Sequence, residues 1–496
     1  MGCHLSSAVL DRRRLLKAGV AAPFATAFIA APSWASHADP VAALVADFTK
    51  PAGNLALSVA VAQDGHTRFY NAGTRALGAR ARVDEHAIYE IGSITKTFTG
   101  LLLAHAIKEK RLKLSDPVNQ HLPAGFGNLA HEGRAVTLAD LVTTTSALPD
   151  NIPDWRVMLH DVEPRELPVE YAKLLRDYGS ANFLADLKAT RLVGLPGRTP
   201  RHSNAASQLL AIVLERLHQQ SYERLIGRYI ERPLGMRSGT GGVPDSLLVT
   251  GYDGLAMPPL TMPIIRPAGG LRYSAADMVR YIKAQIAGHD PAIALTHEPL
   301  WGSADAQGIG FHWIVSKTAD SITYLRHSGG TFGFSSYCDF YPAQRYGIVL
   351  LTNRAGDFQD KLQQLADSVH EVLCGAPRGL RALETALKAK DYADASATIV
   401  SMKTAYPELH LDEDRMNRWG GRLIGEHRPH AARAIFAYNV ASFPNSANAH
   451  DSYAAALVET GDHHAALIEY RRSLALDPLN ANAVQMIKTL SGEAVP

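Results

Sequence analysis

The chain has 496 residues, of which 46% are hydrophobic and 20% are charged, as is usual for soluble folded proteins. Lys and Arg number 50 and Asp and Glu 48, and this balance excludes the clustered basic excess of a nucleic-acid-binding protein. Three cysteines are too few for a disulfide framework or a four-thiolate metal site. The length suits about three domains, or one large enzyme domain with a smaller companion.

Residues 1–35 contain, in sequence, the three parts of an export signal. A basic cluster at 12–17 (RRRLLK) precedes an apolar run over 18–31 that is too short to span a bilayer, and small residues at the cleavage spacing follow. The consecutive arginines followed by Leu-Leu-Lys resemble the twin-arginine type of signal, so we expect a periplasmic protein. A buried N-terminal helix with basic flanks is the alternative. No later run reaches about 18 apolar residues, so the sequence predicts no transmembrane helix in the mature chain.

Beyond the signal, hydrophobic patterning predicts an α+β domain. Alternating or short apolar runs predict strands over residues 55–62, 68–73, 308–315, 322–326, 334–341 and 346–352. Helical periodicity predicts helices over residues 95–111, 209–217 and 275–286. An early strand pair, a helical middle and late antiparallel strands imply one sheet built from both ends of this segment. Cys338 and Cys374 either pair in an oxidising compartment or remain free buried thiols.

Residues 378–496 are alanine-rich, helical in pattern and internally repeated. Pro444 and Pro478 lie 34 residues apart, and a weaker unit ends at Pro407. The same offset joins Leu423 to Leu457, Ala431 to Ala465, Ala432 to Ala466, Phe436 to Tyr470 and Val440 to Leu474. The period, the small residues where helices cross and the closing proline resemble tetratricopeptide repeats. Such repeats offer a surface for a protein partner, whereas a generic helical cap on the enzyme domain is the alternative.

The first chemical motif is Ser93-Ile94-Thr95-Lys96, which follows strand-like residues 88–92 and opens a predicted helix. At positions i and i+3 the serine hydroxyl and the lysine amine share one helix face. The free N–H groups of a helix N-terminus favour negative charge there. Burial would lower the lysine pKa, as a neutral amine base requires, so the motif predicts a nucleophile–base pair.

Two further motifs complete the constellation. The second is His202-Ser203-Asn204, which a turn delivers just before a helix. The third is HSGGT at residues 327–331, at the end of a predicted strand. Its glycines let a substrate backbone approach closely and leave N–H groups free for an oxyanion hole.

In this order the motifs resemble those of the serine β-lactamase and penicillin-binding protein superfamily, nearest its class C β-lactamase branch with the DD-peptidase and esterase relatives. Supporting stretches lie at residues 91–104, 233–236 and 269–278. The resemblance covers about residues 40–373. It implies an antiparallel sheet flanked by helices, with a helical subdomain between the motifs.

The resemblance also implies roles for the motif residues. Ser93 would be the acylated nucleophile and Lys96 its proton acceptor, while Asn204 would orient the lysine and the substrate amide. The N–H groups of Ser93 and Gly330 would hold the oxyanion. The positions implied to bind substrate are Gly329 and Thr331.

Two departures from the family pattern concern histidines. His202 stands where tyrosine is usual; a neutral imidazole shuttles protons near pH 6.5, so acylation stays possible, but a loop histidine with no catalytic role is the alternative. His327 stands where most β-lactamases carry lysine, which weakens the positive charge that would face a substrate carboxylate.

The resemblance implies an acyl-enzyme hydrolase of D-amino-acid peptides, such as peptidoglycan stem peptides, or of β-lactams. A carboxylesterase on the same scaffold is one alternative. A binding protein that senses penicillin or peptidoglycan, with weak turnover, is another. No cofactor is expected, and no H-E-x-x-H or C-x-x-C spacing supports a metal.

Overall fold

The structure is a computed structural model that describes residues 39–50, 55–239, 247–478 and 480–492. The predicted export signal lies outside these residues. Among the described residues, eight strands form one antiparallel sheet in the order β2-β1-β14-β13-β12-β11-β10-β9. The strands are β1 (Leu57–Gln63), β2 (His66–Ala72), β9 (Trp301–Ser303), β10 (Gln307–Gly310), β11 (Trp313–Lys317), β12 (Thr323–Gly330), β13 (Ser335–Tyr341) and β14 (Tyr346–Thr352).

The pairing of β1 with β14 joins the two ends of the predicted enzyme segment. Leu57 lies opposite Thr352 and Gln63 opposite Tyr346 in an antiparallel register. The sheet is therefore built from both ends of the segment, as the strand order in the sequence predicts. Two-stranded pairs stand outside it: β3 (Ile88–Glu90) with β8 (Arg272–Ser274), β4 (Ala130–His131) with β5 (Arg134–Ala135), and β6 (Tyr252–Asp253) with β7 (Leu255–Ala256).

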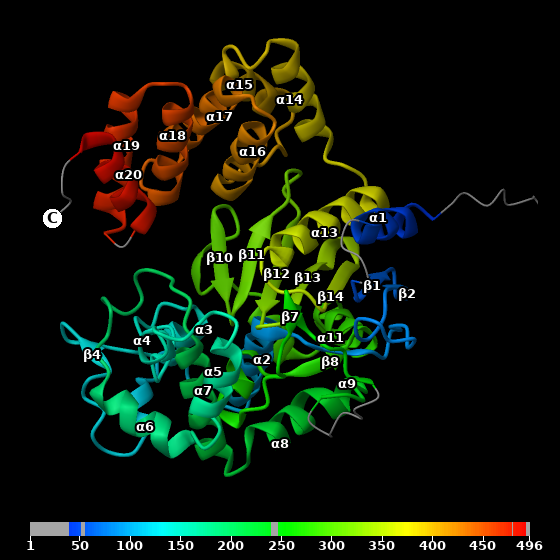
Figure 1. Ribbon diagram of the computed structural model, residues 1–496, viewed down its shortest axis with the longest axis vertical. Helices are drawn as coiled ribbons and strands as arrows, with labels where there is room; N and C mark the ends of the chain where they lie inside the picture. Colours follow the sequence, from blue (N-terminus) through cyan, green and yellow to red (C-terminus); the bar gives the residue numbers. More distant parts are fainter. Residues whose placement is uncertain (1–38, 51–54, 240–246, 479, 493–496) are drawn as a thin grey trace, which may run out of the picture. The chain divides into compact units, whose positions relative to one another are not determined.

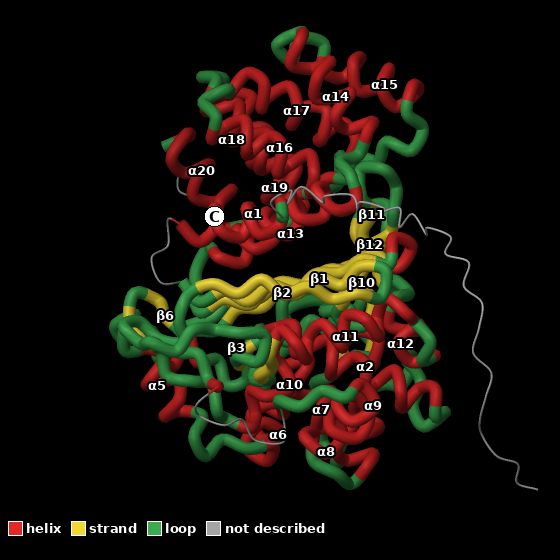
Figure 2. The backbone as a smooth tube through the Cα atoms, turned by 90° about the vertical axis from the view of Figure 1, so that its right-hand side faces the viewer, coloured by secondary structure: helices red, strands yellow, loops and turns green. Residues whose placement is uncertain are grey.

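Helices cover both faces of the sheet (Figure 2). They are α1 (Pro40–Thr49), α2 (Thr95–Lys108), α3 (Leu138–Val142), α4 (Trp155–Met158), α5 (Leu167–Leu174), α6 (Ser180–Ala189), α7 (Asn204–His218), α8 (Tyr222–Ile226), α9 (Arg232–Leu234), α10 (Arg266–Gly269), α11 (Ala275–Ala287), α12 (Pro291–Thr296) and α13 (Phe358–Cys374). Helices α1 and α13 pack on one face, against Val59 and Val61 of β1. Ala60 and Ala62, the alternate residues of β1, face the other core with α2, α7 and α11. This second core supports the helix that begins next to Ser93.

One predicted strand is wrong. Residues 308–315 form two strands, β10 and β11, which pair with each other. Phe311 and His312 between them have φ values of 49° and 72°, so the chain reverses there. No glycine or proline occupies these two positions to signal the turn, although both residues, which are buried, adopt the left-handed region. The turn matters because it places His312 beside the motif residues.

From Arg378 onward, the described residues form helices joined by short loops. The helices are α14 (Arg378–Ala389), α15 (Ala395–Ala405), α16 (Glu413–Gly425), α17 (Pro429–Ser442), α18 (Ala447–Glu459), α19 (His463–Leu476) and α20 (Ala481–Ser491) (Figure 1). Gly420 of α16 faces Phe436 of α17 so closely that a Cβ atom on Gly420 would lie 2.3 Å from the ring. Ala432 and Ala466, which the sequence places at helix crossings, are fully buried. The assignment to tetratricopeptide repeats stays a prediction.

The two described cysteines are free thiols. Cys338 is buried in β13, and Cys374 ends α13. Burial raises the pKa of Cys374 to about 11, so its thiol is protonated at neutral pH. The two sulfurs are unpaired here, as in the second of the two arrangements that the sequence allowed, but Cys374 is only half-buried.

Candidate active site

Ser93 lies in a short 3₁₀ turn, Gly92–Ile94, between β3 and the first residue of α2. Gly92 has φ 51°, and a Cβ atom there would lie 2.5 Å from the backbone nitrogen of Gly330. Only glycine allows this left-handed backbone and this close approach. The turn therefore holds the half-buried Ser93 hydroxyl beside the end of β12.

The side chain of Lys96 is almost entirely buried beneath Ser93, with 2% of its surface exposed. Its Nζ lies 2.7 Å from Ser93 Oγ, 2.9 Å from Asn204 Oδ1 and 2.8 Å from the carbonyl oxygen of Ala268. Burial lowers the pKa of Lys96 to about 7, against a smaller opposing effect of the Asp150 charge. A large share of the amine is thus neutral near pH 7 and can take the proton of Ser93.

Asn204 is the first residue of α7, and its side chain contacts Lys96. Ser203 caps this helix by accepting a hydrogen bond from the N–H of Ala206. The amide of Asn204 accepts from Lys96 through Oδ1 and donates through Nδ2 to Oδ1 of Asn151, 3.0 Å away. These two bonds fix which end of the amide faces the lysine.

The end of β12 packs directly on the Ser93 turn. A Cβ atom on Gly329 would lie 2.2 Å from the carbonyl oxygen of Ile91 and 2.9 Å from the nitrogen of Ser93. Gly329 is therefore buried behind Ser93 and does not itself line the pocket, whereas Gly330 and Thr331 do. A side chain at Gly329 would push β12 away from the nucleophile.

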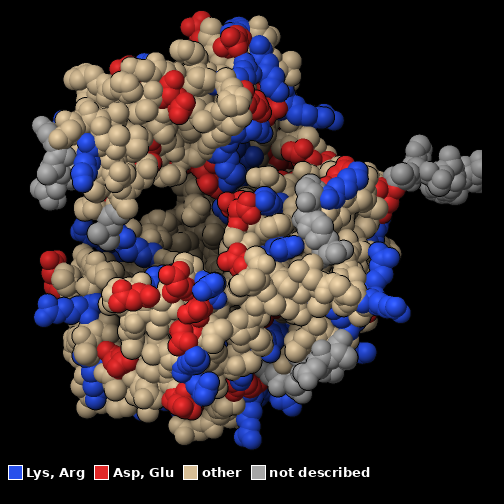
Figure 3. Space-filling model, viewed as in Figure 1, with Lys and Arg blue, Asp and Glu red and all other residues tan. Residues whose placement is uncertain are grey.

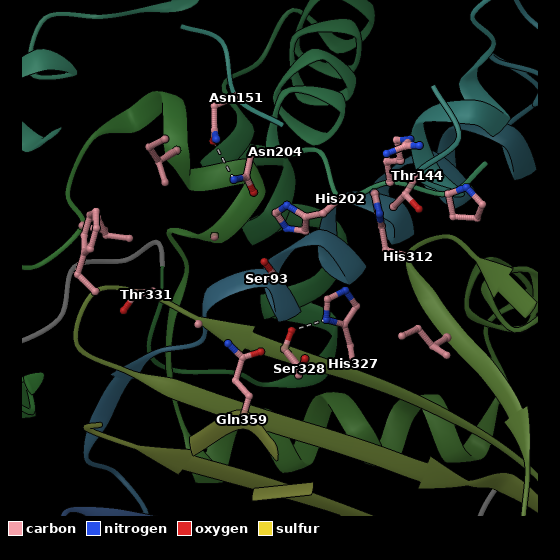
Figure 4. A pocket seen from close by; sticks show the side chains of 18 of the residues that line it. Ser93, Thr144, Asn151, His202, Asn204, His312, His327, Ser328, Thr331 and Gln359 are labelled. Carbon is pink, nitrogen blue, oxygen red and sulfur yellow. Dashed lines mark hydrogen bonds between the residues drawn. The ribbon is translucent and has the colours of Figure 1, made fainter. Parts of the chain in front are cut away.

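His327, at the third motif's basic position, is a neutral imidazole. Its Nδ1–H donates to the carbonyl oxygen of Ser328 at 2.6 Å (Figure 4), which leaves Nε2 as an acceptor. Burial, together with the charge of Lys96, lowers the pKa of His327 to about 3. The third motif thus presents no fixed positive charge at neutral pH.

His202 is paired with a carboxylate that sequence reasoning missed. Its Nδ1 lies 2.6 Å from Oδ1 of Asp150, and the guanidinium of Arg156 bonds the other oxygen of that carboxylate. Burial alone would raise the pKa of Asp150, but the bonds and charges of His202 and Arg156 outweigh it and hold this pKa well below its usual range. No motif joins Asp150 to His202, because 52 residues separate them.

His312 is a third imidazole of the site, and no sequence motif contains it. It is buried at the β10–β11 turn, with Nε2 3.5 Å from the hydroxyl of Ser207. Burial first, and then the charge of Lys96, hold the pKa of His312 well below its usual range. It is therefore a neutral wall residue of the site.

Ser93, His202, Asn204 and His327 line one pocket of about 770 Å³, with Lys96 hydrogen-bonded to Ser93 behind it. Figure 4 shows Ser93, His202, Asn204, His312 and His327 around this space. One wall is aromatic and consists of Trp155, Tyr171 and Phe332, whose ring centroids lie 5.2 to 6.4 Å apart. A pocket with an apolar wall and convergent polar groups suits a small molecule or a peptide end.

Within the described ranges, no three His, Cys, Asp or Glu side chains are grouped so as to hold a metal ion. None of the helices in that same part of the chain is long and apolar enough to cross a membrane.

Comparisons with known proteins agree with this geometry. The beta-lactamase family profile matches residues 41–370, so the chain belongs to the beta-lactamase family and is a serine hydrolase of that family. A beta-lactamase of Pseudomonas fluorescens is 25% identical over 340 residues, covering 60% of this chain and 88% of that protein. The D-alanyl-D-alanine-carboxypeptidase/endopeptidase AmpH of Escherichia coli K12 is 24% identical over 334 residues, covering 62% and 82%.

Solved structures show the same fold. A class C beta-lactamase superposes with a TM-score of 0.58 at 22% identity, covering 68% of this chain and 96% of that one. A beta-lactamase/D-alanine carboxypeptidase from Pseudomonas syringae superposes with a TM-score of 0.55 at 20% identity, covering 68% and 98%. The helices from Arg378 onward lie outside the residues that the family profile matches.

Proposed function

We propose that this protein hydrolyses D-amino-acid peptides or β-lactams through an acyl-enzyme on Ser93. The observation that carries the proposal is the buried amine of Lys96, 2.7 Å from Ser93 Oγ, with a pKa lowered to about 7. An amine that is partly neutral at physiological pH is a base matched to its task. Relatives named beta-lactamase and D-alanyl-D-alanine-carboxypeptidase/endopeptidase support the substrate class.

In the acylation step, Ser93 Oγ bonds to the substrate carbonyl carbon and its proton passes to Nζ of Lys96. The N–H groups of Ser93 and Gly330 stabilise the oxyanion that forms. The carbon–nitrogen bond then breaks, and the leaving nitrogen takes the proton back from Lys96. Asn204 keeps the amine aimed at Oγ through its 2.9 Å contact. Water afterwards hydrolyses the ester on Ser93.

A carboxylesterase is the second candidate, and the neutral His327 favours it. A substrate carboxylate gains from a fixed positive charge in the pocket, and an imidazole with a pKa of about 3 does not supply one. An ester without a carboxylate next to the scissile bond does not need such a positive charge for binding.

We also propose export and a partner-binding tail. Residues 1–35 would be a twin-arginine signal that delivers the enzyme to the periplasm. Residues 378–496 would be tetratricopeptide-like repeats that bind a protein partner. The alanines at the expected helix crossings, Ala432 and Ala466, are fully buried, which supports the repeat assignment.

Steady-state kinetics with three substrates tests the choice between these activities. The assay compares kcat/KM for nitrocefin, for a peptide ending in D-Ala-D-Ala and for p-nitrophenyl acetate, in the wild type and in Ser93→Ala. If the main proposal is correct, kcat/KM for the lactam or the peptide should depend on Ser93 and should exceed kcat/KM for the ester. Ester turnover that exceeds both would select the carboxylesterase, and acylation without turnover would indicate a sensor.

A further inference from the structure

We propose that Asp150 is the positioning residue of a second proton-transfer system, in which His202 carries the proton of the deacylating water. This inference rests on the proposed acyl-enzyme and adds the group that resolves it. Asp150 acts through His202 and does not touch the substrate, whereas the imidazole lines the pocket with Ser93.

The carboxylate of Asp150 is held on both sides. Oδ1 lies 2.6 Å from Nδ1 of His202, and Oδ2 accepts a hydrogen bond from Arg156. The guanidinium of Arg156 in turn lies 4.7 Å from the ring centroid of Trp155, a separation that suits a cation–π contact. The side chain of Asp150 therefore has one oxygen committed to arginine and the other to histidine.

The backbone of Asp150 ties the same loop to the second motif. Its carbonyl oxygen accepts hydrogen bonds from the N–H groups of Asn204 and Ala205, at 2.8 and 3.1 Å. Asn204 follows His202 by two residues, so the histidine and its carboxylate are joined both through side chains and through the backbone. A change confined to the side chain of Asp150 leaves these backbone bonds in place.

The pairing decides which nitrogen of His202 is free. A carboxylate only accepts, so Nδ1 must carry the hydrogen and the neutral ring presents the Nε2 lone pair. Figure 4 shows the imidazole in the pocket near Ser93 and Asn204. His202 interacts electrostatically with His312, with His327 and with the carboxylate of Asp150, which Arg156 also contacts. Lys96 acts on Asp150, and Tyr171 and Arg201 also line this pocket. Burial holds His312 and His327 neutral, whereas the carboxylate of Asp150 lies 2.6 Å from Nδ1 and supplies negative charge that stabilises an imidazolium.

Deacylation consumes one water molecule. The water oxygen bonds to the acyl carbon while one water proton passes to Nε2 of His202, and Asp150 holds the resulting imidazolium at Nδ1. The tetrahedral intermediate then collapses, the bond between the acyl carbon and Ser93 Oγ breaks, and His202 returns the proton to Oγ. The acyl group leaves as a carboxylic acid. Lys96 serves acylation, and His202 with Asp150 serves deacylation.

The isosteric variant Asp150→Asn tests the inference. Arg156 keeps the amide oxygen, so the NH₂ group faces Nδ1 and donates to it, which forces the hydrogen of His202 onto Nε2 and removes the base. Asp154→Asn is the matched control, because Asp154 lies on the same loop, is exposed and does not line this pocket. The probe is p-nitrophenyl acetate, whose rapid release of nitrophenolate reports acylation and whose steady state reports deacylation.

We expect Asp150→Asn to slow the steady state about 100-fold while the acylation burst changes less than about threefold. His202→Ala should lose as much, and the double variant no more than His202→Ala alone, because the two residues act as one unit. In ¹⁵N NMR spectra, the wild-type His202 should carry its hydrogen on Nδ1 and the Asp150→Asn variant on Nε2. Asp154→Asn should match the wild type in every measurement.

Three results would overturn the inference: equal steady-state rates in Asp150→Asn and Asp154→Asn, an equal loss in burst and steady state, or a wild-type His202 with its hydrogen on Nε2. The proposed function fails in a different way, through a wild type that shows no Ser93-dependent burst. The NMR measurement needs no turnover and still decides the tautomer in that case.

Discussion

Replacing Lys96 by methionine tests two consequences of the buried amine, one for the acylation rate and one for the free energy of unfolding. Methionine keeps the length and bulk of the side chain but cannot take a proton from Ser93. Loss of a general base costs about 100-fold or more, so acylation should fall by at least that factor. In the wild type the acylation rate should rise with pH through about 7, since burial lowers the Lys96 pKa to that value.

The lowered pKa of Lys96 also predicts how the free energy of unfolding changes with pH. The pKa of Lys96 is about 7 in the folded protein and 10.5 for an exposed lysine. Between these values the unfolded chain binds a proton that the native protein does not, so this residue makes the free energy of unfolding rise with pH. The slope approaches about 1.4 kcal/mol per pH unit, which gives about 2 kcal/mol between about pH 7 and pH 9.

The assay is urea unfolding of wild type and Lys96→Met at several pH values in that interval. The difference in unfolding free energy should move in favour of the wild type by about 2 kcal/mol, because only the wild type carries the titrating amine. Parallel stability curves, or an acylation rate that does not change with pH below about 8, would show that the amine is not held near neutrality, and the reasoning would be refuted.

Two further substitutions probe other parts of the molecule. His327→Lys adds a positive charge at the third motif, so the ratio of kcat/KM for nitrocefin, which carries a carboxylate, to that for p-nitrophenyl acetate should rise about tenfold; an unchanged ratio would contradict the interpretation of His327 as a neutral residue. Gly420→Ala should lower the free energy of unfolding of the helical segment by about 1–3 kcal/mol in urea titrations, since its Cβ atom would lie 2.3 Å from the ring of Phe436. Gly421→Ala is the matched control, with no atom within 4 Å of its Cβ position, and equal effects of the two changes would contradict the packing argument.

The nucleophile and its base could be predicted from the sequence because their geometry is local. Ser93 and Lys96 are three residues apart on one helix, so the helix itself brings hydroxyl and amine together. The antiparallel sheet and its pairing of β1 with β14 also followed from strand patterning and order. The close fit of Gly92 against Gly330 could not be predicted, because it depends on the packing of β12; the glycines of the third motif predicted the close approach of a substrate backbone instead.

Asp150 and His312 could not be predicted from the sequence, because tertiary contacts alone connect them to the motifs. Asp150 becomes a partner of His202 only where its loop is hydrogen-bonded to the start of α7. His312 enters the site through a turn formed by two residues in the left-handed backbone region, without glycine or proline. In the same way, the neutral state of His327 results from burial and from Lys96, not from its motif.

Intact mass spectrometry after incubation with a fluorescent penicillin tests the central claim, acyl-enzyme formation on Ser93, most directly. We expect one adduct with the added mass of the penicillin, located on the peptide that contains Ser93, and no adduct in Ser93→Ala. The absence of any adduct on the wild type, together with p-nitrophenyl acetate hydrolysis that Ser93→Ala leaves unchanged, would contradict this claim.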